Sequence, residues 1–251
     1  MKNRINCIVI IFTMTALALS CSKNNDNPVP EQTCRITSIT SSSSGVPASY
    51  FSYNDDGRVR EIRQGDNVVK NFVYSGPNTI IMTYISGIFD MKIILTWDDN
   101  GFVLNRREEF NETGTDWYNI SFEYNDMQLS RSVSTNSRGI TRGITTYSWE
   151  NGNLASKITP NTTLQYEYYT DKPMQLGDYS GTHDDLRNYG AENAIHKNKN
   201  LVKSIFITNR STGSSSTQNW SYEFDSLGKI VAAVSLLGST STRWDYEYEC
   251  E

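Results

Sequence analysis

The sequence is dominated by a short pattern that recurs five times: an aromatic residue, a polar turn, and an apolar residue that starts the next strand. The copies are YFSYNDDGRVREI at 50–62, ILTWDDNGFVLNR at 94–106, SFEYNDMQLSRSV at 121–133, TYSWENGNLASKI at 146–158 and SYEFDSLGKIVAA at 221–233. With weaker copies around Tyr74, Tyr168 and Tyr246, the spacing is about 20–27 residues, the length of two strands and two turns. The pattern therefore predicts a succession of β-hairpins.

Each copy alternates apolar and polar residues as it enters its turn. Glu123, for example, lies between Phe122 and Tyr124. A period of two gives a strand one buried side and one side that faces water. We therefore expect the big rings to face a common interior: the anchors Tyr53, Trp97, Tyr124, Trp149 and Phe224, together with Trp220 and Trp244. Trp117 has the opposite phase and is the best candidate for an exposed aromatic residue.

The residues after each anchor predict a tight turn. Asn, Asp or Glu follows the anchor, often with a glycine such as Gly57 that can adopt positive φ. The next strand then starts at an apolar residue: Val59, Val103, Leu129, Leu154 or Ile230. The solvent-facing sides are expected to carry charged residues, among them Arg106, Glu108, Glu123, Lys157 and Glu247.

The fold class that follows is all-β. About sixteen candidate strands run from CRITSIT at 34–40 to RWDYEYE at 243–249, and strands joined in this order form a large, strongly curled antiparallel β-meander. A membrane-spanning barrel has a similar signature of alternating segments. The charges expected on the outer side make that alternative the weaker one.

Residues 171–200 interrupt the repeat pattern. Within them, 184–196 could form one short helix that Gly190 disrupts. A curled sheet of sixteen strands encloses more space than its own side chains fill. We therefore predict that this insertion packs into or across the mouth of the sheet as a plug.

The pattern Y-x-Y-[ND]-x-x-G-[KR]-[ILV] resembles the tyrosine–aspartate (YD) repeats of secreted bacterial shell proteins. Over residues 34–251 the chain more closely resembles a family of uncharacterised YD-repeat-like lipoproteins from gut Gram-negative bacteria with a porin-like β fold. TCRITSI at 33–39, YYTDKPM at 168–174 and KNLVKSI at 199–205 carry this resemblance. It implies a porin-like or open-barrel sheet, and it supplies no activity for any residue.

The N-terminus predicts export and lipidation. Lys2 and Arg4 precede an apolar run of about fifteen residues, which suits a signal peptide over 1–20 better than a membrane-spanning helix. The run ends at Ala18-Leu19-Ser20-Cys21, which resembles a bacterial lipobox and implies a lipid anchor at Cys21. Residues 21–33 then form a tether to a single domain at 34–251. We expect an outer-membrane lipoprotein, either periplasmic or surface-exposed; an ordinary signal peptide is the alternative.

Two cysteines remain for the folded region. Cys34 and Cys250 lie at its two ends, and export places them in an oxidising compartment. We predict a disulfide that brings the first strand beside the last, with two free thiols as the alternative. Such a bond closes a loop of about 215 residues, worth up to about 5 kcal/mol in the chain-entropy model.

Chemical motifs are sparse. Metalloprotease, nucleophile-elbow and phosphate-loop signatures are missing from the sequence, so no catalytic, cofactor-binding or metal-ligating residue is predicted. His183 followed by Asp184 and Asp185 reads as a turn or helix cap, and His196 as a surface residue. The net charge of −5 without a basic stripe argues against nucleic-acid binding.

The leading interpretation is a lipid-anchored cell-envelope protein that acts as a non-catalytic binding or scaffold module for a glycan or protein partner. One alternative is an envelope hydrolase with its carboxylates on separate hairpins. The other is a purely structural shell that encloses its own insertion. An open pocket with exposed aromatic residues would favour the binding module, and an interior sealed by aromatic residues would favour the shell.

Overall fold

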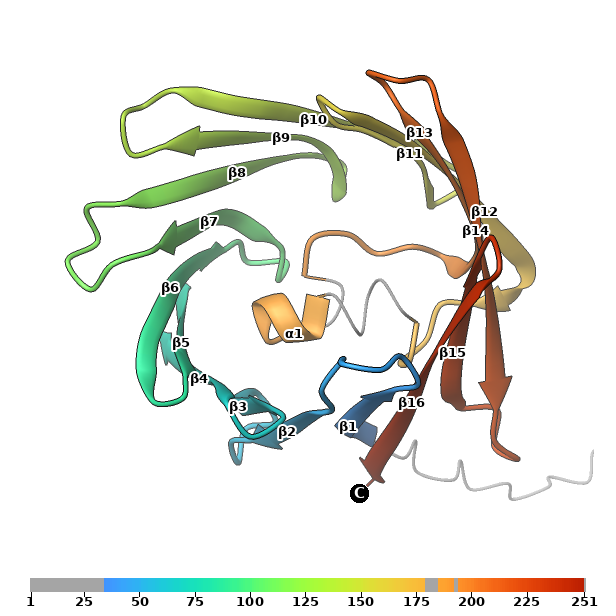
Figure 1. The fold of residues 1–251 in the computed structure, drawn as a ribbon, viewed down its shortest axis with the longest axis horizontal. Helices are drawn as coiled ribbons and strands as arrows, with labels where there is room; N and C mark the ends of the chain where they lie inside the picture. The colour runs from blue at the N-terminus through green and yellow to red at the C-terminus, as the bar shows by residue number, and fades with distance from the viewer. Residues whose placement is uncertain (1–33, 179–184, 192–193, 251) are drawn as a thin grey trace, which may run out of the picture. The chain divides into compact units, whose positions relative to one another are not determined.

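The protein is a closed antiparallel barrel of sixteen strands, seen in a computed structural model that describes residues 34–178, 185–191 and 194–250. Each strand pairs with the next in sequence, and β1 pairs with β16 (Figure 1). The predicted meander is confirmed, and its sheet is closed rather than open. Among the described residues, none of the helices has the length and apolar character needed to cross a membrane.

The strands are β1 Cys34–Ser41, β2 Ser49–Tyr53, β3 Val59–Gln64, β4 Val68–Ser75, β5 Asn78–Ile85, β6 Ile88–Trp97, β7 Val103–Glu109, β8 Trp117–Asn125, β9 Gln128–Asn136, β10 Thr141–Glu150, β11 Asn153–Ile158, β12 Thr162–Pro173, β13 Asn200–Asn209, β14 Ser215–Phe224, β15 Ile230–Leu237 and β16 Thr240–Cys250.

A β-bulge lies at the same place in all five repeat hairpins. The ladder shifts register immediately before Tyr53, Trp97, Tyr124, Trp149 and Phe224, so that each anchor opposes the apolar residue that starts the next strand. A bulge adds one unpaired residue to a strand. Beyond it the alternation changes phase, and both the anchor and the restarting residue can face the interior.

This phase change corrects three of the predicted solvent-facing charges. Arg106 pairs with buried Leu95 and Glu108 with buried Ile93, so both side chains face the barrel interior. Lys157 pairs with Tyr147 on the same inner side. Regular alternation from Val103 would place residues 105 and 107 inside. The bulge adds one residue to the strand, so residues 106 and 108 face inside instead.

The turns of the five repeats have two lengths, but the strands on either side pair in the same register. The longer ones fold around an Asn or Asp: the Gly57 N–H donates to the Asn54 carbonyl at 2.9 Å, and Gly57 has φ of 81°. The shorter ones have two residues at positive φ, Asp126-Met127 and Asn151-Gly152. Two-residue loops of this kind match the twist of a hairpin. All these turns lie at one end of the barrel, which we call the motif rim.

The anchors also join each hairpin to its neighbour. Tyr124 on β8 donates from its hydroxyl to the carbonyl of Val103, the first residue of β7, at 2.9 Å. The same bond recurs around the wall, always to a residue on the preceding strand. The donor–acceptor pairs are Tyr53–Ile36, Tyr74–Val59, Tyr124–Val103, Trp149–Leu129, Tyr168–Leu154 and Tyr248–Ile230. In the last pair the anchor is Tyr248, not Tyr246 as the sequence suggested.

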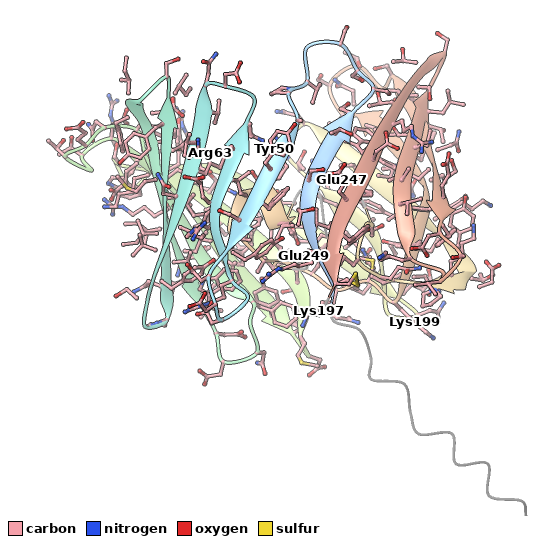
Figure 2. The ribbon with its side chains drawn as sticks, turned by 90° about the horizontal axis from the view of Figure 1, so that it is seen from below. Tyr50, Arg63, Lys197, Lys199, Glu247 and Glu249 are labelled. Atoms are coloured by element: carbon pink, nitrogen blue, oxygen red, sulfur yellow. A yellow bond between two sulfur atoms is a disulfide. The ribbon has the colours of Figure 1, made fainter. Side chains whose placement is uncertain are left out.

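The outer side of the wall is polar. Cross-strand ion pairs join Arg35 to Glu249 at 2.8 Å and Arg131 to Glu123 at 2.6 Å, and Arg243 bonds both Asp245 and Glu223. Figure 2 shows Tyr50, Arg63, Glu247 and Glu249 on this outer surface of β1, β2, β3 and β16. The inner side carries the buried residues, among them Ile36, Phe51, Ile62, Ile81 and Leu95.

Candidate functional site

The described part of the insertion lies inside the barrel. It contains α1 Asp185–Tyr189, which is surrounded by the strands in Figure 1. Leu186, Tyr189 and Ala194 are buried in one apolar cluster with wall residues such as Phe72. The Val103 N–H donates to the Ala194 carbonyl at 3.0 Å, which ties the insertion to β7. The predicted plug is therefore seen in the described residues as a packed part of the core.

The helix is shorter than the sequence suggested, because Gly190 ends it. Gly190 has φ of 74°, and its N–H donates to the Leu186 carbonyl at 3.0 Å. A Cβ at this position would lie 2.6 Å from a ring carbon of Phe72. The insertion therefore approaches β4 closely at a residue without a side chain, as glycine permits.

Polar groups from the wall and the insertion meet deeper in the barrel. The Lys70 ammonium donates to the Arg187 carbonyl at 3.1 Å. Burial, with Arg187 and Arg106 nearby, lowers the pKa of Lys70 to about 8. Arg106 lies 2.7 Å from a Glu108 carboxylate oxygen and 5.1 Å from the ring centre of Tyr189. Burial also raises the pKa of Tyr189, so this phenol remains neutral.

Two rim pockets are lined by described residues, and the first lies between the insertion and the ends of β3 to β6. Its volume is about 380 Å³, within the range of small-molecule sites. Three aromatic side chains line it, Tyr74 and Trp97 from the wall and Tyr189 from the insertion. Its charged lining is Arg58 on one hairpin and Asp98 and Asp99 on another. Burial raises the pKa of Tyr74 to about 12. The remaining lining residues are Gly76, Pro77, Thr79, Gly101, Gly190 and Ala191.

The second rim pocket, of about 320 Å³, lies beside β10 to β13. Three of its lining residues, Asn153, Lys199 and Asn200, bond one another. Asn153 accepts from the N–H groups of Lys199 and Asn200, each at 2.9 Å, and donates to the Asn200 side chain at 3.1 Å. The Tyr168 hydroxyl donates to the Leu154 carbonyl. This pocket therefore lies where the end of the insertion is hydrogen-bonded to the wall. Lys199 lies with Lys197 toward the motif-rim end of the barrel in Figure 2.

The two predicted disulfide cysteines are joined. Cys34 and Cys250 form a disulfide at the start of β1 and the end of β16, where the two strands pair. The Lys229 ammonium lies 3.4 Å from the Cys250 sulfur. Both ends of the described barrel thus lie at the motif rim. Cys21, the predicted lipidation site, lies outside the described residues, as do the signal peptide and the tether.

The aromatic predictions are supported by burial except at Phe224, which is exposed. Trp220 and Trp244 are buried and stack with ring centres 5.5 Å apart. Trp117 is half-buried, with the Arg107 guanidinium carbon 4.7 Å from its ring centre. His196 was expected at the surface, but it is half-buried with its ring 6.2 Å from that of Trp149. The position of the insertion inside the barrel is the reason for that difference.

Of the predicted turn motif His183-Asp184-Asp185, only Asp185 is described. It is buried, and one of its carboxylate oxygens accepts from the Ile195 N–H at 3.5 Å. Within the described ranges, no three His, Cys, Asp or Glu side chains are grouped to hold a metal ion. Asp98 and Asp99 belong to one of the polar turns that the sequence predicts, and their pocket was missed because nothing local shows that Tyr189 lies opposite them.

The fold is shared by solved structures, among them two from Bacteroides species. One is described as a porin-like protein from Bacteroides uniformis, with 12% identity and a TM-score of 0.63 over 85% of this chain and 96% of that chain. The other, a porin-like protein from Bacteroides vulgatus, has 14% identity and a TM-score of 0.62 over 85% and 98%. No family model and no curated protein matches the sequence. At these identities the likeness concerns the fold alone.

Proposed function

We propose that this chain is a lipid-anchored protein of the outer membrane, held at Cys21, that acts as a non-catalytic binding or scaffold module. Its partner would be a glycan or a protein, bound at the motif rim. The lipobox-like sequence before Cys21 supports the lipid anchor. The resemblance to YD-repeat-like lipoproteins supports the location in the cell envelope.

The polar outer side is the observation that carries the proposal. Arg131, Glu123 and Arg243 project from strands of the wall and form ion pairs there. On the lipid side of a membrane barrel, a Lys or Arg near the midplane costs about 2–4 kcal/mol. A wall with such pairs is better suited to water, so a lipid would be the membrane attachment.

The insertion inside the barrel argues against a conduit. Sixteen-stranded porins leave an aqueous channel. Here Leu186 and Tyr189 of the insertion belong to the same buried cluster as the wall. The remaining candidate for recognition is the motif rim, where the larger pocket has an aromatic and charged lining.

A purely structural shell is the second candidate, favoured by the same packing of the insertion against the wall. The two differ in whether the larger rim pocket takes a ligand. The hydrolase alternative would need a pair of carboxyls on facing walls of a cleft. Asp98 and Asp99 are consecutive residues of one hairpin, which supports the non-catalytic proposal.

Replacement of the lipid-acceptor cysteine tests the anchor. We expect Cys21→Ala to move the protein from the washed membrane fraction to the soluble fraction, because the polar wall alone should not insert into a bilayer. Cys7→Ala, in the signal peptide, is the matched control and should leave the protein membrane-bound. A Cys21→Ala protein that has lost its signal peptide, as checked by mass, and still resists alkaline extraction from membranes would instead indicate a membrane-spanning wall and overturn the proposal.

A further inference from the structure

We propose that the larger rim pocket binds a saccharide, with Trp97 as the stacking surface and Asp99 and Arg58 as the groups that bind its hydroxyls. This inference rests on the proposed binding function and names its ligand class and its site. Three features of the lining support it. The polar atoms of the wall aromatics are already hydrogen-bonded, two other polar groups have no partner among the described residues, and the charged side chains are of both signs.

The polar tips of the wall aromatics are already bonded. The Trp97 indole N–H donates to the Thr79 hydroxyl at 2.9 Å, and the Tyr74 hydroxyl donates to the Val59 carbonyl at 2.7 Å. What these side chains offer a ligand is therefore ring carbon. A pyranose has an apolar face of C–H groups that packs against an aromatic ring, and large rings supply most of the apolar contact in such sites.

The hydroxyl groups of the same sugar need donors and acceptors. Arg58 is held in place because its Nε and Nη2 bond Asp56 and its guanidinium lies 4.0 Å from the ring centre of Tyr74. No described residue accepts from Arg58 Nη1, which is left for a ligand. Asp98 accepts with one oxygen from the N–H groups of its own turn and with the other from the Asn100 side chain at 3.3 Å. The Asp99 carboxylate makes no hydrogen bond within the described residues and is available as an acceptor.

The lining carries charges of both signs. Asp98 and Asp99 would repel an anion, and Arg58 would repel a cation. A neutral molecule whose hydroxyls both donate and accept suits a lining of mixed sign, because hydrogen bonds to ionised groups are the strong ones. The cavity of about 380 Å³ suits a mono- or disaccharide. The smaller rim pocket has three tyrosines and the opposite charges of Glu150 and Lys199 in its lining, but it has no tryptophan, and its Asn153 and Asn200 amides bond each other.

The test uses the indole N–H signals of the five tryptophans in the full chain, purified in detergent and labelled with ¹⁵N. Trp97→Phe identifies the Trp97 signal, and Trp149→Phe, the equivalent anchor of another repeat, is the matched control. The probes are the methyl glycosides of glucose, galactose, mannose and N-acetylglucosamine, their β-linked disaccharides, and choline as a simple cation. We expect at least one saccharide at millimolar concentration to shift the Trp97 signal selectively.

Asp99→Ala should weaken that saccharide at least tenfold. Asp55 occupies the equivalent turn position in the first repeat and does not line the pocket, so Asp55→Ala should leave the affinity unchanged. Unchanged signals of the other tryptophans establish that each variant is folded. The inference is overturned if no saccharide of the panel shifts Trp97, if only choline does, or if Asp99→Ala and Asp55→Ala behave alike.

The recovered sugar separates this inference from the proposed function. A saccharide that shifts Trp97 and is recovered unchanged supports both. A saccharide that binds and is cleaved supports the pocket but contradicts the non-catalytic assignment. If no saccharide shifts the Trp97 signal but Cys21 still anchors the protein to the membrane, the saccharide site is contradicted and the proposed function is not.

Discussion

Removal of the Tyr124 hydroxyl is the sharpest test of how the wall is held together. In Tyr124→Phe the ring stays, but the 2.9 Å bond to the Val103 carbonyl is lost. Val103 has 0% of its surface exposed, so water should not readily replace the missing donor. A buried polar group left without its partner costs about 1–3 kcal/mol. For a chain of this size each kcal/mol lowers the melting temperature by about 2–4 °C.

The measurement is the free energy of unfolding from urea titration, followed by tryptophan fluorescence. Tyr50→Phe is the matched control, because Tyr50 is 53% exposed on the outer side and should change stability by less than about 0.5 kcal/mol. Tyr74→Phe and Tyr168→Phe remove the same bond elsewhere on the wall and should resemble Tyr124→Phe. If the three variants are no less stable than Tyr50→Phe, the anchor bonds do not stabilise the barrel and the reasoning is wrong.

Three further predictions concern the seam, the plug and the buried lysine. Cys34→Ser should lower the free energy of unfolding by up to about 5 kcal/mol, because the disulfide closes a separation of 216 residues, and calorimetry under non-reducing conditions checks this. Gly190→Ala should lower the melting temperature more than Gly213→Ala does, since both have positive φ but only the first meets Phe72; equal losses would contradict the plug packing. Lys70 has a folded pKa of about 8, below the ordinary lysine value of 10.5, so the unfolded chain holds the extra proton between these values and the contribution of Lys70 to stability should rise with pH there, by about 3 kcal/mol. Lys70→Met should abolish that rise in urea titrations at pH 7.5 to 10.5, and an unchanged pH dependence would refute the assignment.

Much of the fold follows from the sequence because its signals are local. The anchor, the turn and the restarting residue lie within a few positions of one another, and the apolar period around Tyr124 places its ring inside without knowledge of the rest. The side reached by Arg106 or Lys157 could not be predicted in this way. It depends on one extra residue in the ladder, and an insertion of one residue reverses every side chain after it.

The candidate site was less predictable than the wall. Trp97 and Asp99 lie in one repeat, but Tyr189 comes from an insertion about 90 residues later, and only the three-dimensional path of that insertion brings it opposite them. Asp99 has the sequence signature of any polar turn residue. Its difference from Asp55 lies in its surroundings, which no local pattern encodes.

The disulfide between β1 and β16 also has a mechanical consequence. Any pull on the chain upstream of Cys34 reaches the barrel at a residue covalently bonded to the final strand, and the load is shared between the two ends of the polypeptide. Neither terminal strand can then be peeled away alone, because its free end is fixed to its neighbour. A protein tethered from its N-terminus would withstand drag on that tether until the sulfur–sulfur bond is reduced.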